Sequence, residues 1–259
     1  MNIPTLFAHY ALIPYALIPF FFIAVVAGGV DAVAGGGGLI TLPLLLIAGV
    51  PPAAAVATNK LGSIGGSLSA TLYFIKIGRI PFRSVRLMTC TTFAGAILGG
   101  MMLTRVNSEC LYAIIPALLI GFSLYFLLMP TIGKRDRKGL IGPCLFAVTA
   151  APLIGGYDGF FGPGTGTFFC AALTVLRGFS LINATAHAKL LNLSSNSAAL
   201  CFFLAQGVIL WPIGLVLLAG QLIGGYLGAQ IAMKHGTPLI KVIMVVMAIA
   251  VSLKLLTAS

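Results

Sequence analysis

Four ionisable side chains lie inside long apolar runs of this chain. They are two acids and two bases, namely Asp31, Asp158, Lys60 and Lys189. A charge at the centre of a membrane helix costs about 2.5 to 3.5 kcal/mol, so each of these groups needs a partner or a function. The aspartates and lysines can neutralise one another. Alternatively, the lysines bind an anion and an aspartate carries a coupling proton, because burial favours the neutral form of a carboxylate.

Hydrogen-bonding residues accompany both lysines at helical spacing. A lysine and two such residues recur at i, i+3 and i+7 in two places: Lys60, Ser63 and Ser67, then Lys189, Asn192 and Asn196. This spacing puts the three side chains on one helix face. An otherwise apolar helix with such a stripe is expected to line a polar site. Asn59 and His187 lie next to the lysines on a different face, and His187 either joins the site or bonds to a neighbouring carbonyl.

Glycine-rich stretches precede two short apolar segments. Residues 35–38 precede the segment 39–50, and residues 162–166 precede the segment 167–176. Broken backbone at membrane depth is tolerated only where protein buries it or where it lines a polar cavity. The start of a short helix directs free N–H groups and a positive dipole end at the break, which favours an anion. The amides predicted to bind it, together with the lysines, are those of Gly36, Gly37, Gly38, Gly164 and Thr165.

Composition places these groups in a chain that is solvated by lipid. Of its 259 residues, 59% are hydrophobic and 7% are charged, and the mean hydropathy is +1.11. Soluble domains carry about 25% charged residues. The net charge of +11 arises from basic residues in short loops, which is typical of cytoplasmic membrane loops rather than of a nucleic-acid surface. The five cysteines form no C-x-x-C pair and lie mostly inside apolar runs, so neither a metal site nor a disulfide is expected. No cofactor is expected either.

The apolar runs divide into ten segments separated by polar loops. They are residues 11–34, 39–50, 53–77, 87–103, 111–129, 140–161, 167–176, 183–206, 211–233 and 239–256. Eight of the ten are long enough, or nearly so, to cross a hydrocarbon core of about 30 Å as helices. The pattern predicts an all-α polytopic membrane protein. Two small-residue motifs, Gly95-x-x-x-Gly99 and Gly224-x-x-x-Gly228, predict close helix packing rather than chemistry.

The chain also repeats itself. A shift of 127 residues places the first glycine cluster and Asp31 on the second cluster and Asp158, and a shift of 129 places Lys60 on Lys189. Because the matched residues are rare types, charges and glycines, a chance match of apolar letters is a poor explanation. We therefore predict two related transmembrane halves, residues 1–130 and 140–259, joined by a basic linker at residues 131–139.

Basic residues are spread unevenly over the loops. They gather before the segment 87–103 and in the linker, namely Lys76, Arg79, Arg83 and Arg86, then Lys134, Arg135, Arg137 and Lys138. Both regions are expected to be cytoplasmic. The repeat equivalent of the first loop, residues 207–212, has no charge and should face outward. The two halves would then have inverted topology, and inverted repeats with interrupted segments point to a binding site near the bilayer midplane.

Two stretches that contain these residues resemble a known family. Residues 31–60, DAVAGGGGLITLPLLLIAGVPPAAAVATNK, are similar to the signature of the TauE/SafE sulfite exporter family, and YDGFFGPGTGTFF with ATAHAKLLNLSSN resembles its YfcA-like branch. The resemblance covers nearly the whole chain. It implies an inner-membrane transporter associated with export of sulfite, sulfonates or related sulfur-containing anions. The matching residues are Gly35, Gly36, Gly37, Gly38, Asn59 and Lys60, then Gly162, Gly164, His187, Lys189 and Asn192.

Together the residues and the resemblance predict a secondary transporter, not an enzyme, that exports a small anion across the bacterial inner membrane. Lys60 and Lys189 would be the counter-charges, and Asp31 or Asp158 would carry a coupling proton. Its partners would be the anion and the lipid bilayer, with no nucleic acid, and a homodimer is one option for its assembly. No ATP-binding motif is present in the sequence, so ion or potential coupling, or facilitated diffusion, is implied.

Two other functions fit part of the pattern. An anion channel would use the same polar site. An intramembrane aspartyl protease would use Asp31 and Asp158 as a pair of carboxyls that share a proton. The G-x-G-D element of such proteases is missing before Asp31, and two lysines accompany the acids, so the protease is the weaker alternative.

Overall fold

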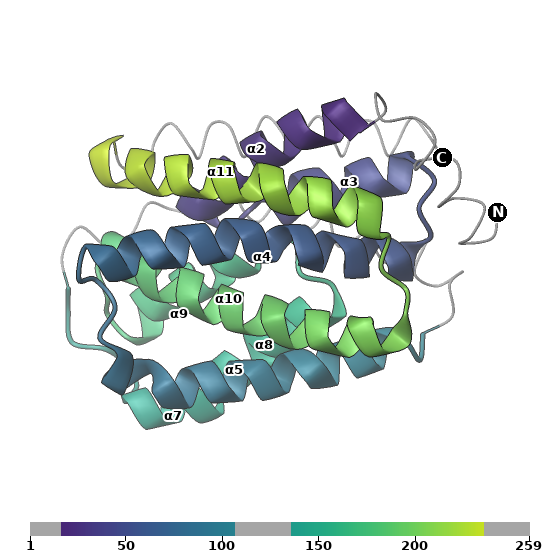
Figure 1. The fold of residues 1–259 in the computed structure, drawn as a ribbon. Helices are drawn as coiled ribbons and strands as arrows, with labels where there is room; N and C mark the ends of the chain where they lie inside the picture. The colour runs from purple at the N-terminus through teal and green to yellow at the C-terminus, as the bar shows by residue number, and fades with distance from the viewer. Residues whose placement is uncertain (1–16, 107–135, 236–259) are drawn as a thin grey trace.

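The computed structural model describes residues 17–106 and 136–235, and these residues are drawn in colour in Figure 1. Every regular element in these two ranges is an α-helix, with no strand among them, as the apolar pattern predicts. The helices are α2 (Leu17–Ala34), α3 (Gly38–Ile47), α4 (Pro52–Lys76), α5 (Phe82–Leu103), α7 (Pro143–Val148), α8 (Ala150–Phe160), α9 (Thr165–Leu176), α10 (Leu181–Gln206) and α11 (Trp211–His235). The expected spans at 111–129 and 239–256 lie outside the described residues.

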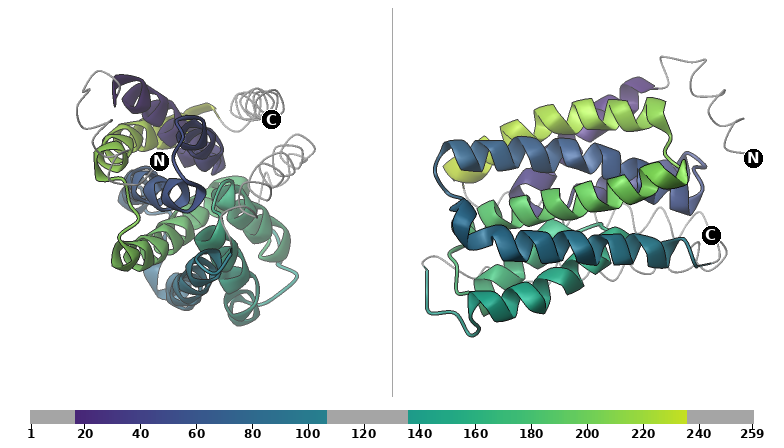
Figure 2. Two further views of the ribbon diagram at one scale, coloured as in Figure 1. Left: turned by 90° about the vertical axis from the view of Figure 1, so that its right-hand side faces the viewer. Right: turned by 60° about the horizontal axis from the view of Figure 1, so that its bottom comes forward.

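Two long helices, α4 and α10, pack against each other in the middle of the bundle (Figures 1 and 2). Helix α11 packs against α2 and α4 on one side of this pair, and α5 packs against α8 and α10 on the other. Each outer pair therefore joins one helix from before the linker with one from after it. The central pair carries the polar stripes, so their side chains are shielded by protein.

Glycine explains why α2 and α8 end where they do. Gly35 follows α2 with a φ of +75°, and Gly162 and Gly164 follow α8 with φ of +100° and +82°. Such left-handed angles are accessible to glycine at low cost and interrupt an α-helix. The short helices α3 and α9 then begin at Gly38 and Thr165 and have 10 and 12 residues. The expected short helices after glycine breaks are therefore present, with starts one or two residues earlier than expected.

One expected segment is wrong. Residues 140–161 were expected to form one long helix, but the structure divides them into α7, of 6 residues, and α8, of 11 residues. The division falls at Thr149, where φ is −119° and ψ is −78°. Pro152 accounts for it, because proline has no N–H to donate and its ring clashes with the carbonyl four residues earlier, that of Val148.

Glycines allow the outer helix pairs to approach closely. A β-carbon on Gly95 or Gly99 of α5 would overlap the backbone of Pro152 or Gly156 in α8. A β-carbon on Gly224 or Gly228 of α11 would likewise overlap the backbone of α2, at Val25 and Gly29. The predicted packing role of both small-residue motifs is thus confirmed.

The loop from α4 to α5 and the loop from α10 to α11 lie at opposite ends of the bundle. The loop from α4 to α5 lies at one end with the start of α10, since Arg79 Nη1 donates to Asn183 Oδ1 at 3.5 Å. Asp136, before α7, accepts from Asn183 Nδ2 at 2.9 Å and therefore lies at the same end. The loop from α10 to α11 lies at the other end, where the Leu210 N–H donates to Thr58 Oγ1 near the start of α4 (Figure 1).

Large apolar side chains cover the outside of the bundle. Leu153 is 74% exposed, and Phe22 and Leu98 are 63% and 62% exposed. Among the described helices, Val85–Leu103 and Trp211–Lys234 are both long and apolar enough to cross a membrane. Helices α4 and α10 have 25 and 26 residues, so they are also long enough, while their buried polar residues lower their mean hydropathy. This is the arrangement of a helical membrane protein with an apolar outside and a polar centre.

Candidate functional site

The four ionisable residues form two ion pairs that cross between the halves of the chain. Lys60 Nζ on α4 lies 2.7 Å from Asp158 Oδ1, at the end of α8. Lys189 Nζ on α10 lies 3.1 Å from Asp31 Oδ2, near the end of α2. All four side chains are 6% exposed or less. The structure therefore shows the mutual neutralisation that the sequence left as one of two alternatives.

Thr165 and Gly162 complete the surroundings of Asp158. The Thr165 hydroxyl, at the first residue of α9, donates to Asp158 Oδ1 at 2.7 Å. A β-carbon on Gly162 would overlap Lys60 Nζ and lie 2.9 Å from Asp158 Oδ1, so only glycine leaves room for the pair. The second carboxylate oxygen, Oδ2, is buried without a hydrogen-bond partner among the described residues. Asp158 is thus held at one oxygen by two donors.

The surroundings of Asp31 are built from backbone. Lys189 Nζ donates to the main-chain carbonyl of Asp31 as well as to its carboxylate. The same carbonyl accepts from the Gly35 N–H at 2.7 Å. The Gly37 N–H reaches Asp31 Oδ1 at 3.4 Å. Lys189 therefore places a positive charge at the carbonyl end of α2, where the helix dipole is negative.

The two glycine breaks meet between the ion pairs. A β-carbon on Gly35 would overlap the backbone of Gly166 and Thr167, and one on Gly38 would lie 3.1 Å from Pro163 Cα. A β-carbon on Gly166 would lie 3.1 Å from Lys189 Nζ. The expectation that the breaks come together is confirmed, and the predicted amides of Gly36, Gly37, Gly38, Gly164 and Thr165 are buried there. That these amides bind an anion remains a prediction.

The polar stripes next to the lysines are buried as well. Ser63 and Ser67 on α4 are 8% and 0% exposed, and Asn192 and Asn196 on α10 are 3% and 2% exposed. Ser67 Oγ donates to the Ser63 carbonyl at 2.7 Å, and Asn196 Nδ2 donates to the Asn192 carbonyl at 2.7 Å and to its Oδ1 at 3.0 Å. These residues satisfy one another along their own helices, so part of their bonding capacity is already used.

Asn59 and His187 have different surroundings. Asn59 Oδ1 accepts from the Thr41 hydroxyl of α3, and a β-carbon on Gly38 would lie 3.4 Å from Asn59 Nδ2. Asn59 therefore joins the region where the breaks meet. His187 Nδ1 lies 2.7 Å from the Asn183 carbonyl, and its ring packs edge-on against Phe179 with centroids 4.8 Å apart. The carbonyl partner is the alternative that the sequence left open for His187.

Sequence reasoning missed Gln221 on α11. Its side chain is fully buried, and neither Oε1 nor Nε2 has a hydrogen-bond partner among the described residues. A β-carbon on Gly66 would lie 3.2 Å from Gln221 Oε1 and 3.7 Å from Asp31 Oδ2, which places the carboxamide near the carboxylate. The available signal was weak, because Gln221 is one of two glutamines in the apolar segment 211–233 and differs from Gln230 by lying three residues before Gly224 of the packing motif.

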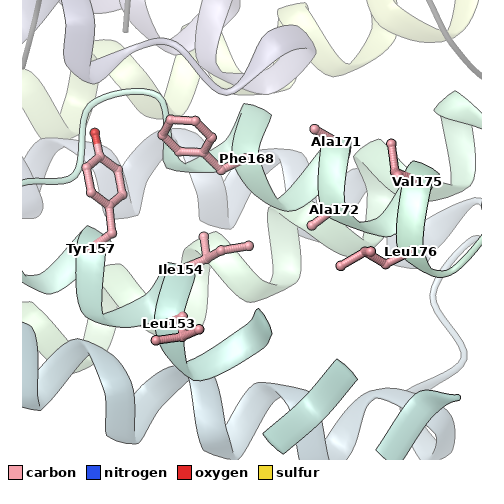
Figure 3. Close-up of a pocket in the computed structure, with 8 residues that line it drawn as sticks. All are labelled: Leu153, Ile154, Tyr157, Phe168, Ala171, Ala172, Val175 and Leu176. Carbon is pink, nitrogen blue, oxygen red and sulfur yellow. The ribbon is translucent and has the colours of Figure 1, made fainter. Parts of the chain in front are cut away.

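A separate apolar groove lies between α8 and α9 (Figure 3). It has a volume of about 510 Å³ and is lined by Leu153, Ile154, Tyr157, Phe168, Ala171, Ala172, Val175 and Leu176. Tyr157 OH donates to the Pro163 carbonyl at 2.5 Å, so its polar end is turned to the glycine break. The lining contains none of the four charged residues, and an apolar surface of this kind suits hydrocarbon rather than an anion.

The pairing of the aspartates with lysines differs from the arrangement that an aspartyl protease requires. A protease dyad requires two carboxyls that share one proton. Here each carboxyl is paired with an ammonium group from the opposite half instead. Among the described residues, no three histidine, cysteine or acidic side chains gather where they would hold a metal ion.

Comparisons with known proteins identify relatives of this chain. The chain is 43% identical over 243 residues to the probable membrane transporter protein YfcA of Escherichia coli strain K12, covering 94% of this chain and 90% of the relative. It is 44% identical over 243 residues to the probable membrane transporter protein ORF9 of a Sinorhizobium species, covering 93% of both. A probable membrane transporter protein of Haemophilus influenzae is 42% identical over 235 residues, covering 91% of this chain and 92% of the relative. No solved structure matches.

The family model described as sulfite exporter TauE/SafE matches residues 20–255. The match spans both glycine breaks and all four residues of the crossed ion pairs. This chain therefore belongs to the TauE/SafE family of membrane transporters.

Proposed function

We propose that the chain is a secondary transporter that exports a small anion, such as sulfite or a sulfonate, across the bacterial inner membrane. The observation that carries the proposal is the crossed arrangement of Lys60 with Asp158 and Lys189 with Asp31 where the two glycine breaks meet. The family description and the names of the relatives support transport, and the positive charges of the site support an anionic substrate.

The charge balance of the site indicates how transport is coupled. Two lysines and two aspartates sum to zero in a region shielded from water, so an anion that enters alone leaves an uncompensated charge. If one aspartate takes up a proton for each negative charge of the anion, the site stays neutral. The lysine released by that aspartate then binds the anion. A monoanion requires one proton and a dianion requires two.

The proposal includes inverted halves with the site near the bilayer midplane. The loop from α4 to α5 and the loop from α10 to α11 lie at opposite ends of the bundle, which supports the inversion. Exposed basic residues gather at the end that carries the first of these loops, namely Lys76, Arg79, Arg86, Arg137, Lys138 and Lys234. Under the positive-inside rule, this end would be cytoplasmic.

A first experiment identifies the anion. Purified protein in detergent is screened by thermal shift against sulfite, sulfoacetate, thiosulfate, phosphate and nitrate. A ligand that binds only the folded state at 100 times its Kd stabilises it by about 2.7 kcal/mol. We expect a sulfur oxyanion to give the largest shift, and equal shifts for all five anions would remove the assignment to this class.

Proteoliposomes then test the coupling. Flux of the selected anion should be accompanied by protons in the ratio set by its charge, measured with an internal pH dye. Electrogenic flux far above carrier rates and without proton movement would favour the channel. The control is Asp136→Asn, which changes an exposed carboxylate outside the ion pairs and should keep the ratio.

A further inference from the structure

The carboxamide of Gln221 occupies a slot that two glycines of α4 create. A β-carbon on Gly62 would lie 2.8 Å from Gln221 Nε2. A β-carbon on Gly28 of α2 would lie 2.6 Å from the main-chain carbonyl oxygen of Gln221, which shows that α2 packs on the backbone of α11 at this residue. Gly66 completes the slot, since its β-carbon would stand 3.2 Å from Oε1. A polar amide buried without a partner costs about 1 to 3 kcal/mol, so its presence in this slot needs a compensating role.

The slot opens towards Asp31. The missing side chain at Gly66 leaves clear the space between Gln221 Oε1 and Asp31 Oδ2, which would lie 3.2 and 3.7 Å from a Gly66 β-carbon. In the ion-paired state, Asp31 Oδ2 faces Lys189 Nζ at 3.1 Å. When Lys189 leaves to bind an anion, the carboxamide is the nearby neutral group on α11 that can replace it.

A carboxamide suits a carboxyl that changes its protonation state. Its oxygen accepts a hydrogen bond from a protonated carboxyl, and its NH₂ group donates to an ionised one. It can therefore serve both states without carrying a charge of its own.

In the part of the chain that the structure describes, the second ion pair has no carboxamide at the equivalent position. The repeat shift of 129 residues relates Gln221 to Thr92, Gly62 to Leu191 and Gly66 to Ser195. The equivalent space therefore holds a leucine and two hydroxyls in place of the glycines and the carboxamide. Thr92 Oγ1 donates to the Ala151 carbonyl at 3.4 Å.

We propose that Gln221 is a positioning residue for proton coupling, which accepts a hydrogen bond from protonated Asp31 in the anion-loaded state and so makes Asp31 the proton carrier. The inference rests on the proposed function. The proton comes from water on the open side of the transporter, Asp31 becomes a neutral acid, and the freed Lys189 ammonium balances the anion. Gln221 Oε1 then accepts from the acid O–H, so the buried acid keeps a hydrogen-bond partner.

Few other groups that titrate or carry charge surround Asp31. Helix α10 contributes Lys189, and α4 contributes Lys60, which also interacts electrostatically with Asp31. Helix α3 has no ionisable side chain, and on α9 the Cys170 thiol interacts with Lys189. Helix α11 offers the uncharged Gln221. Because Gln221 is uncharged, it can be replaced without changing the net charge of the site.

The test uses proteoliposomes and inorganic sulfite as the probe, with initial uptake measured from pH 5 to pH 8. Gln221→Leu removes the acceptor while keeping an apolar side chain in the slot, so the melting temperature should stay equal or rise. The pH of half-maximal uptake should fall by about one unit, the effect of one hydrogen bond on a protonation equilibrium. Thr92→Val is the matched control, and it should keep the wild-type midpoint.

The outcomes separate this inference from the proposed function. Sulfite uptake by the wild type with no dependence on protons would overturn both. Proton-coupled uptake with a wild-type midpoint in Gln221→Leu would overturn the inference alone, and Gln221 would then only fill space. Gln221→Met provides a second variant of similar length, and failure of both variants to fold would likewise assign Gln221 a purely structural role.

Discussion

The two buried ion pairs use the same residue types but differ in what else holds each carboxylate. Asp158 accepts a hydroxyl bond from Thr165 at 2.7 Å in addition to the Lys60 bond at 2.7 Å. Asp31 has a longer contact with Lys189, at 3.1 Å, and a long amide contact with Gly37, at 3.4 Å. Charge-assisted bonds are stronger when they are short. Asp158 is therefore the more firmly held acid, and Asp31 is the acid that the proposed coupling would release from its lysine.

The difference also lies in what the lysines do. Lys60 bonds the side chain of Asp158, whereas Lys189 bonds both the side chain and the main-chain carbonyl of Asp31. Departure of Lys189 thus frees the end of α2 as well as a carboxylate. In the proposed mechanism, the Lys60–Asp158 pair stabilises the bundle and the Lys189–Asp31 pair responds to protons and substrate.

The largest expected effect comes from breaking either pair. Lys60→Met and Lys189→Met should each destabilise the protein by about 3 to 5 kcal/mol, because each leaves a buried carboxylate without its counter-charge. The measurement is the loss of folded protein on heating or in denaturant, in detergent. Loss of anion binding should accompany both changes.

Double variants then separate the pairs. Lys60→Met with Asp158→Asn should recover most of the stability, since the unpaired charge is gone. Lys189→Met with Asp31→Asn should recover less, because the Asp31 carbonyl still lacks its lysine donor. Equal recovery of both would mean that the main-chain bond contributes nothing. Recovery of transport, as well as folding, would make the lysines structural and place the substrate site elsewhere.

A smaller effect is expected from the hydroxyl on Asp158. Thr165→Val removes a hydrogen bond to an ionised group, which contributes about 1.5 to 3 kcal/mol to stability. The matched control is Thr174→Val on the same helix, whose buried hydroxyl has no partner among the described residues. That change should be neutral or stabilising. A Thr165→Val variant as stable as wild type would show that Asp158 is held no more firmly than Asp31.

The smallest effect concerns an acid outside the pairs. The backbone N–H of Ser180 donates to Asp136 and holds the pKa of its carboxyl below the ordinary value. Because this pKa is lower in the folded state than in the unfolded state, the carboxylate stabilises the folded protein at pH values above the unfolded-state pKa, about 3.9. This contribution is lost as the pH falls through the folded-state pKa. The melting temperature of Asp136→Asn should therefore lie slightly below that of wild type at pH 7, and the gap should close below pH 4. The gap is small because water screens this exposed group.

Much of the fold follows from the sequence because its signals are local. The glycine clusters mark the ends of α2 and α8, and the apolar runs mark the long helices. The division at Thr149 was missed although Pro152 is visible in the sequence. A proline in an apolar run either kinks a membrane helix or divides it, and the choice depends on whether neighbours satisfy the freed backbone groups.

Only part of the candidate site could be predicted from the sequence. The spacing around Lys60 and Lys189 identified buried polar faces, and the glycine breaks identified where they meet. Which lysine pairs with which aspartate depends on how the two halves pack, and sequence spacing carries no information on that. Gln221 was missed for the same reason, since the slot that holds its carboxamide is formed by glycines of α4 facing α11.

The packing of α2 against α11 has a consequence for biosynthesis. The glycine face of α2 fits the backbone of α11, which is the last of the described helices to be synthesised. At translation rates of about 5 to 20 residues per second, α2 waits on the order of tens of seconds for this partner. Throughout that interval Asp31 also lacks most of its final neighbours. The newly inserted chain therefore needs lipid, water or the insertion machinery to shield an acidic helix until its distant partners arrive.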